Sequence, residues 1–203
     1  MDEAVSTTPD GTRTAILEAA RGLFVSQGYH GSSMRQIAAQ AGIALGSIYN
    51  HFANKEDIFK HILWEYHPYR QVLQEVQQSQ ITQLENFLRF ASQRMLSAIN
   101  ERPAILNLIL IEVVEFNSQH IPEMFSSALP TLEQVFEQIL ISDPRIRDID
   151  LPVLVRAFVG IFLSFYLSDK LLSSSSIPTE YRTSTMDDFV DIFLHGVLRC
   201  DPS

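Results

Sequence analysis

A run of hydroxyl, amide and imidazole side chains lies between residues 47 and 51, at a spacing that lets it contact a polar partner. Tyr49, Asn50 and His51 fall between Ile48 and Phe52, two apolar residues four positions apart. Residues four apart share one face of a helix, so the apolar pair should point inward and the polar side chains outward. Such polar groups can hydrogen-bond the edges of DNA bases or phosphate oxygens.

Two short helices and a glycine turn must position these side chains. Ser33 can cap a first helix, and its apolar stripe has helical spacing: Met34, Ile37, Ala38 and Ala41. Gly42 can adopt the left-handed backbone that ends this helix, and a second helix follows at once. This pattern is typical of the helix-turn-helix, whose second helix enters the DNA major groove. The alternative is a plain helical hairpin in a scaffold or partner-binding protein without DNA function.

Residues 41–56, which read AGIALGSIYNHFANKE, and residues 13–29, which read RTAILEAARGLFVSQGY, resemble the TetR family of transcriptional regulators. The resemblance covers about the first sixty residues, and beyond them rests only on length and helical character. It implies DNA-contacting positions, mostly to phosphates, at Ser33, Arg35, Ser47, Tyr49, His51 and Lys55. Leu45, Gly46 and Asn50 are implied to lie nearer the bases. Ala44 stands where such proteins often have a serine or threonine cap, and Leu45 where a polar or basic residue is frequent, so the second helix is less firmly capped. Leu45 can instead touch a thymine methyl group.

The whole chain of 203 residues has the composition of a folded helical protein, with 46% hydrophobic and 19% charged residues. Apolar periodicity predicts an all-α fold: a three-helix DNA-binding domain followed by a helical bundle. The expected helices are residues 13–27, 34–41, 45–52, 55–77, 81–100, 103–118, 122–141, 151–172 and 185–198. The expected domains are a mobile arm at 1–11, the DNA-binding domain at 12–54 and a ligand-binding and dimerisation domain at 55–203. Pro68 should either kink the helix at 55–77 or end it.

Charge is unevenly divided along the chain, whose net charge is −9. Residues 11–60 hold five basic and three acidic residues, a net +2, whereas residues 61–203 hold ten basic and eighteen acidic residues, a net −8. A basic module on an acidic body favours local, salt-sensitive binding of phosphates over unspecific coating of nucleic acid.

The last two expected helices have the pattern of a homodimer interface. Gly160, Ser164 and Ser168 recur every four residues, and small side chains let another helix approach closely. The alternative is packing within one chain. The full set of candidate interface residues is Phe158, Gly160, Ile161, Ser164, Phe165, Ser168, Phe189, Phe193 and Gly196.

Large apolar side chains in the middle of the chain are candidates for a pocket that takes a hydrophobic or amphipathic effector. Most of them must form core, so each candidate has core packing as its alternative. Glu112 interrupts an apolar run and is either buried with a partner or simply exposed. The candidates are Trp64, Phe87, Phe90, Leu108, Ile111, Glu112, Phe116, Phe125, Phe136, Phe162 and Tyr166.

Other chemistry finds little support. His61 and Glu65 lie four apart and could ligate a metal together with His120, but such pairs usually face solvent. No nucleophile-elbow, phosphate-loop or dinucleotide motif occurs, so we expect no enzyme activity and no cofactor. The single cysteine, Cys200, fits a reducing cytoplasm. Residues 151–172 are long enough to cross a membrane, yet Arg156 and Asp169 favour a buried helix. The sequence therefore predicts a cytoplasmic dimeric repressor of operator DNA, released by an effector.

Overall fold

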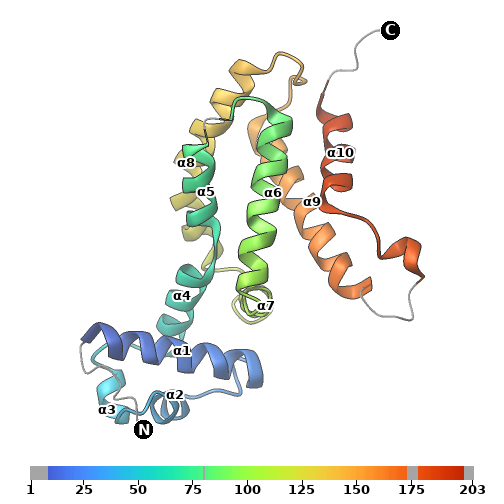
Figure 1. Cartoon of the computed structure of the whole chain (residues 1–203). Coiled ribbons are helices and arrows are strands. Elements are labelled where there is room, and N and C mark those ends of the chain that lie inside the picture. The colour runs from blue at the N-terminus through green and yellow to red at the C-terminus, as the bar shows by residue number, and fades with distance from the viewer. Residues whose placement is uncertain (1–8, 80, 173–177, 199–203) are drawn as a thin grey trace. The chain divides into compact units, whose positions relative to one another are not determined.

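Helices make up nearly all of the computed structural model, which describes residues 9–79, 81–172 and 178–198 (Figure 1). Within this part of the chain no strand forms, and a single isolated bridge joins Ile146 to Leu198. The all-α prediction is therefore confirmed. The helices are α1 Pro9–Gln27, α2 Met34–Gln40, α3 Leu45–Ile48, α4 Lys55–Tyr66, α5 Tyr69–Gln78, α6 Leu84–Glu101, α7 Ile105–Glu115, α8 Ile121–Ser142, α9 Leu151–Leu172, the 3-10 helix η1 Thr179–Tyr181 and α10 Met186–Val197.

Helix α1 begins earlier than expected. Pro9, Asp10 and Gly11 belong to its first turn, although the sequence placed them in a mobile arm at 1–11. Proline suits a first turn because the missing N–H is not needed there, and Asp10 interacts favourably with the helix dipole. The rest of that arm, residues 1–8, lies outside the described residues.

The helices form two compact units. One unit holds the chain up to Pro68 together with Glu101–Ser127, and the other holds Tyr69–Asn100 with Ala128–Ser203. The first unit thus extends past the expected boundary between residues 54 and 55, and the expected assignment of functions to the domains stays a prediction. The physical reason is that the apolar face of α4 completes the core of the N-terminal unit, since Ile58 and Phe59 are fully buried there.

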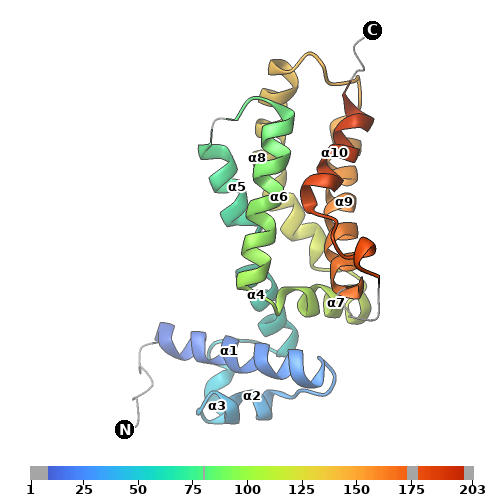
Figure 2. The same cartoon turned by 45° about the vertical axis from the view of Figure 1, so that its right-hand side comes forward.

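Aromatic rings hold the centre of the N-terminal unit. The Phe59 ring lies 5.8 Å from that of Phe24 and 5.7 Å from that of Tyr29, and it stacks on Phe116 at 4.7 Å. Figure 2 shows α1 lying across α2 and α3 in this unit. Side chains of α1, α4 and the α7–α8 corner thus pack against the buried face of the helix-turn-helix.

The helix expected at residues 55–77 is divided into α4 and α5. Tyr66 ends α4, His67 adopts an extended backbone with ψ 123°, and α5 begins at Tyr69. Proline restricts the residue before it to extended conformations and lacks the N–H that a continuing helix needs. Pro68 therefore ends a helix and does not merely kink one.

His67 should make the stability of the protein depend on pH. Burial, together with the nearby positive charge of Arg102, lowers the pKa of His67 to about 4 from 6.5. Between these two pH values the unfolded chain binds the proton and the folded chain does not. The free energy of unfolding should therefore fall by about 2 to 3 kcal/mol as pH drops from about 6.5 to 4.

Denaturant titrations between pH 4.5 and 7 measure this dependence, with His67→Asn as the comparison. Asparagine does not titrate, so the variant's stability should change less with pH over this range. Equal pH slopes for the two proteins would contradict the role assigned to His67.

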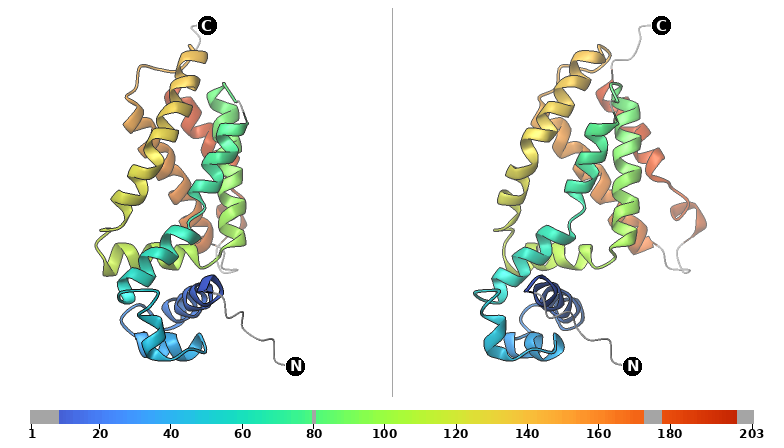
Figure 3. Two further views of the ribbon diagram at one scale, coloured as in Figure 1. Left: turned by 90° about the vertical axis from the view of Figure 1, so that its left-hand side faces the viewer. Right: turned by 60° about the vertical axis from the view of Figure 1, so that its left-hand side comes forward.

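The second unit is held together by ion pairs and ring contacts between helices. Arg89 on α6 pairs with Asp187 and Asp191 on α10, and Arg94 on α6 pairs with Glu75 on α5. Rings of Phe87 and Phe136 join α6 to α8 at 5.0 Å. The views in Figure 3 show α5, α6 and the second half of α8 side by side, as these contacts require.

Most remaining helices lie close to their expected bounds. Residues 151–172 match α9 as expected, and Thr185, expected as the first residue of the last helix, caps α10 from outside. Helix α7 ends at Glu115, three residues before the expected end, because Asn117 and Ser118 have positive φ values of 51° and 61°. Pro103 precedes α7 and does not occupy its first turn. Cys200 lies outside the described residues.

Candidate nucleic-acid interface

The turn between α2 and α3 has the backbone geometry that its sequence predicts. The Ser33 hydroxyl accepts a hydrogen bond from the Gln36 N–H at 3.3 Å and so caps α2. Gly42 has φ 70°, and the Ile43 N–H donates to the Ala38 carbonyl at 3.0 Å. This is the Schellman ending, which uses a left-handed residue just after a helix. Glycine fits there without the cost that a Cβ atom would bring.

Helix α3 is a single turn, Leu45–Ile48, continued by turns as far as His51. Its N-cap Ala44 makes no side-chain hydrogen bond, as expected from the missing polar residue. The expected helix over residues 45–52 is thus only half as long. The Ser47 N–H donates to the Ala44 carbonyl at 2.9 Å, but no side chain caps the helix, which weakens so short an element.

The outward face of this segment is exposed as the sequence predicts. Ile48 and Phe52 are buried, whereas Leu45 is 42% and Tyr49 53% exposed. Gly46 and Asn50 are also exposed, and the side chains of Ser47 and His51 are half-buried. Nothing in the described structure covers this face, so it is free to meet a partner.

Most cations of this module are already paired. Arg13 is bonded to Glu65 at 2.7 Å, Arg21 to Glu18, and Lys60 to Glu123 at 2.7 Å. Over the described residues 9–60, Arg35 on α2 is the basic residue for which the structure gives no polar partner. The net charge of +2 therefore overstates the positive charge that a phosphate could contact. Arg35 is the main source of that accessible charge.

Lys55 has a different position from the one expected. Its Nζ donates to the carbonyls of Tyr29 and Ser32, both at 2.7 Å, and lies 4.0 Å from the Tyr29 ring centroid. Burial lowers the pKa of Lys55, an effect that Glu115 partly offsets. The ammonium thus fastens the turn between α1 and α2 and does not point to solvent. Sequence spacing could not show this, because both acceptors lie more than twenty residues away.

The candidate pocket residues are distributed over both units. The N-terminal unit contains Trp64, Leu108, Ile111, Glu112, Phe116 and Phe125, and the second unit contains Phe87, Phe90, Phe136, Phe162 and Tyr166. Leu108 is fully buried, whereas Phe125 is 41% exposed. Many of these side chains are therefore core, the alternative stated for each of them.

Glu112 is buried and has a protein partner. Its carboxylate accepts the backbone N–H of His120 at 2.7 Å and lies 2.8 Å from His120 Nδ1. The other ring nitrogen of His120 faces Glu56 at 3.4 Å. The buried alternative is confirmed, and Glu112 links the two sides of the α7–α8 corner.

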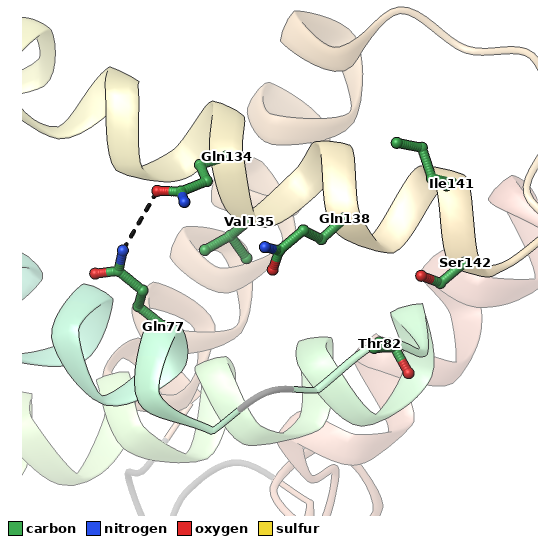
Figure 4. Close-up of a pocket in the computed structure, with 7 residues that line it drawn as sticks. All are labelled: Gln77, Thr82, Gln134, Val135, Gln138, Ile141 and Ser142. Carbon is green, nitrogen blue, oxygen red and sulfur yellow. Dashed lines mark hydrogen bonds between the residues drawn. The ribbon is translucent and has the colours of Figure 1, made fainter.

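A pocket of about 580 Å³ lies in the second unit, between the end of α5, the segment just before α6 and the second half of α8 (Figure 4). None of the eleven candidate pocket residues lines it. Five of its seven lining residues carry an amide or a hydroxyl group, although most of the lining surface is apolar. The candidates, in contrast, are mostly large apolar side chains. The lining residues are Gln77, Thr82, Gln134, Val135, Gln138, Ile141 and Ser142.

The candidate interface residues on α9 and α10 divide into two groups. Phe158 packs on Phe193 at 6.3 Å, and Phe165 on Phe189 at 5.3 Å, so these four rings join the two helices within one chain. Ile161 and Ser168 are half-buried, whereas Gly160, Ser164 and Gly196 are exposed. The same two helices carry further exposed apolar residues: Val153, Leu163, Leu167, Leu171 and Ile192.

Helix α9 is long and apolar enough to cross a membrane, by length and composition alone. One such helix is weak evidence, because the core helix of a soluble protein passes the same test. The expectation that it does not cross a membrane stays a prediction.

The residues considered for a metal site are otherwise engaged. His61 Nδ1 lies 2.8 Å from the Asp57 carbonyl, and Glu65 is paired with Arg13. Among the described residues no three side chains of His, Cys, Asp or Glu are grouped so that they could hold a metal ion.

Comparison with known proteins shows which family the N-terminal module resembles. Residues 16–62 match the family model described as bacterial regulatory proteins, tetR family. The N-terminal module is therefore similar to the DNA-binding domain of tetR-family proteins. UidR of Escherichia coli, an HTH-type transcriptional regulator, is 38% identical over 63 residues, or 31% of this chain and 32% of UidR. AcnR of Corynebacterium glutamicum, an HTH-type transcriptional repressor, is 37% identical over 59 residues, or 29% of this chain and 31% of AcnR.

The chain thus spans about a third of the length of the curated tetR-family relatives it matches. Solved structures extend the likeness of fold to nearly the whole chain. GusR of Salmonella enterica superposes with a TM-score of 0.70 at 23% identity, covering 96% of this chain and 99% of GusR. FadR of Bacillus subtilis, solved with stearoyl-CoA, gives 0.63 at 20% identity, covering 90% and 95%. At these identities the likeness shows the fold alone.

Proposed function

We propose that this protein is a transcriptional repressor that binds operator DNA through α2 and α3. The observation that carries the proposal is the exposed, uncovered face of α3 beside the unpaired Arg35, held rigid by a Schellman turn and an aromatic core. The names of the tetR-family relatives, regulator and repressor, support it. Binding would occur in the cytoplasm and would involve no catalysis.

Each polar group has a proposed role set by its position. Ser33, Arg35, Ser47, Tyr49 and His51 would bond phosphates, which fixes the register of the module on DNA. Three further residues would lie against the bases, with Leu45 against a thymine methyl group and Gly46 and Asn50 beside it. Lys55 would act indirectly, since it positions the turn between α1 and α2.

Binding to the promoter of the protein's own gene, measured by fluorescence anisotropy at several salt concentrations, tests the proposal. Arg35→Ala should weaken binding and reduce the slope of log affinity against log salt by about one per site. Tyr49→Ala should weaken binding about tenfold or more, whereas Arg182→Ala in the second unit should change nothing. Binding that is insensitive to both α2–α3 variants would refute the proposed interface and favour a scaffold without DNA function.

We further propose that two chains pair through α9 and α10. The exposed row Val153, Leu163, Leu167 and Leu171 is larger than the scattered apolar residues usual on a monomer surface. Glycines at 160 and 196 have open space where a Cβ would stand, so a second helix can approach closely. A two-fold dimer would present two α3 helices to successive turns of DNA.

Sedimentation equilibrium measures this pairing. The unaltered chain should have the mass of two chains, and Leu167→Glu should shift it to that of one because a buried, unpaired charge is costly. Glu137→Gln, an exposed change on α8, serves as the control. A monomeric unaltered chain at micromolar concentration would contradict the proposal.

Release from DNA is proposed to follow the binding of a hydrophobic or amphipathic effector in the helical body. An effector changes DNA affinity only by its differential affinity for the two conformations. FadR of Bacillus subtilis, which shares the fold, was solved with stearoyl-CoA, an amphipathic molecule. The buried aromatic residues of the second unit, Phe87, Phe136 and Phe162, are the proposed apolar contacts.

A further inference from the structure

The α7–α8 corner contains a buried histidine whose two ring nitrogens have different neighbours. His120 is 7% exposed, and Glu112 beside it is fully buried. His120 Nδ1 lies 2.8 Å from the Glu112 carboxylate, which as an anion only accepts hydrogen bonds, so Nδ1 carries a proton. His120 Nε2 lies 3.2 Å from the side-chain nitrogen of Gln119 and 3.4 Å from a carboxylate oxygen of Glu56. The two groups at Nε2 are thus a donor and an acceptor.

This pair of neighbours lets Nε2 gain or lose a proton without losing its hydrogen bond. Without the proton, Nε2 accepts from the Gln119 amide, which also donates to Glu56 at 2.6 Å. With a proton taken from solvent, Nε2 donates directly to the Glu56 carboxylate. The Glu56 side chain is 48% exposed, so solvent reaches this edge of the ring. Since histidine changes its charge between about pH 5 and 8, His120 can exchange one partner for the other in this range.

The charged groups that face the His120 ring come from two helices and are both negative. Glu112 belongs to α7 and Glu56 to the first turn of α4. The acidic residue in the first turn of α8, Glu123, is paired with Lys60 at 2.7 Å. A proton on the ring therefore meets two carboxylates, one of which belongs to the helix-turn-helix side of the unit.

Glu56 is next to the residue that holds the turn in front of α2. Lys55 Nζ donates to the carbonyls of Tyr29 and Ser32, both at 2.7 Å. Ser33, which caps α2 and is a proposed phosphate contact, follows directly. A change in the anchoring of the first turn of α4 therefore reaches the start of α2 through one side chain.

We propose that His120 is a positioning residue that responds to pH. Protonation of Nε2 replaces the Gln119 amide with the Glu56 carboxylate as the partner of the ring. Charge-assisted hydrogen bonds are about 2.7–2.9 Å long, shorter than the 3.4 Å between Nε2 and Glu56, so the proton draws the first turn of α4 toward the corner. This anchor restricts Lys55 and, through it, the turn before α2.

The consequence for DNA rests on the proposed repressor function. A module that is fixed before it binds loses less conformational freedom on binding. Protonation of His120 should therefore raise the affinity for operator DNA, and by reciprocity bound DNA should favour the protonated ring.

NMR of the full chain without DNA tests the switch itself. The His120 ring and the backbone amides of Ser32 and Ser33 should titrate with one midpoint within about pH 5 to 8. The spectra are recorded in a His30→Gln background, because His30 adjoins these serines and would titrate with them. Serine amides that do not follow the His120 ring would overturn the proposal.

Two glutamate variants in the same background show whether Glu56 transmits the change. Glu56→Gln keeps an acceptor for Gln119 but removes the charge that binds the proton, so the serine amides should no longer follow His120. Its side chain is partly exposed, and circular dichroism verifies that the variant folds. Glu101→Gln, an exposed change in the same unit, is the matched control and should leave the titration unchanged. Serine amides that still follow His120 in Glu56→Gln would also overturn the proposal.

Fluorescence anisotropy with promoter DNA at constant ionic strength tests the consequence. The rise in affinity from about pH 8 to about pH 6 should be about fivefold larger for the unaltered chain than for His120→Gln or Glu56→Gln. His51 lies on the DNA-binding face and titrates in all of these proteins, so the difference isolates His120. His195→Gln, an exposed change on α10, should keep the full pH dependence. An equal pH dependence in the unaltered chain and both test variants would refute the proposal.

The two experiments separate this proposal from the repressor function. If the serine amides follow His120 but no DNA binds at any pH, the repressor function fails and the switch stands. If DNA binds with the same pH dependence in every variant, the repressor function stands and the switch fails.

Discussion

Replacing Phe59 by alanine should lower the free energy of unfolding of the N-terminal unit by about 4 kcal/mol. The side chain is fully buried, and its ring lies within 6 Å of the rings of Phe24, Tyr29 and Phe116. Truncating a buried phenylalanine removes its hydrophobic burial and leaves a cavity, at a typical cost of about 3–5 kcal/mol. The loss should also disorder α2 and α3, because their buried residues share one hydrophobic core with those of α4.

Urea titration followed by Trp64 fluorescence measures this effect, since Trp64 lies on the same helix and reports on the same unit. Phe125→Ala removes an equally large ring that is 41% exposed, and should cost less than about 1 kcal/mol. If Phe59→Ala cost no more than this control, α4 would not belong to the core of the N-terminal unit, and the division of the chain would need revision.

Replacing Glu112 by alanine should lower the free energy of unfolding by about 3 kcal/mol. The carboxylate is fully buried and holds both the backbone N–H and Nδ1 of His120. Its removal leaves these groups buried without a partner, and hydrogen bonds to charged groups contribute about 1.5–3 kcal/mol. The positive φ values of Asn117 and Ser118 show that the same corner is also constrained in its backbone.

Glu112→Gln separates the two contacts, because the amide oxygen can still accept the His120 N–H. It should cost about half as much as Glu112→Ala. Glu101→Ala, an exposed change at the end of α6, is the control for removing a carboxylate and should cost less than about 0.5 kcal/mol. A Glu112→Ala variant as stable as this control would show that the pair does not stabilise the corner.

Features that depend on neighbouring residues could be predicted from the sequence. The Ser33 cap, the left-handed Gly42 and the burial of Ile48 and Phe52 follow from contacts within a few positions. Helix α9 was predicted with its observed ends for the same reason. Pro68 was expected to bend or end a helix, and local sterics decide that as well.

Features that depend on distant partners could not be predicted. A pattern of residue types marks Lys55 as a basic residue at a helix start, but only the fold brings the carbonyls of Tyr29 and Ser32 to its ammonium. The net charges of +2 for residues 11–60 and −8 for residues 61–203 are also known from the sequence. They do not show which basic side chains are paired, and within the described residues 9–60 only Arg35 has no polar partner.

By itself, the sequence determined the all-helical architecture, the helix-turn-helix and its exposed face, because helix periodicity, capping and turns are set by residues close along the chain. Only the tertiary structure decided that α4 belongs to the N-terminal core, that Glu112 is buried against His120, and that amides line the pocket beside α5 and α8. The physical reason is that burial and pairing depend on which surfaces meet, and sequence periodicity shows that a face is apolar without showing what covers it.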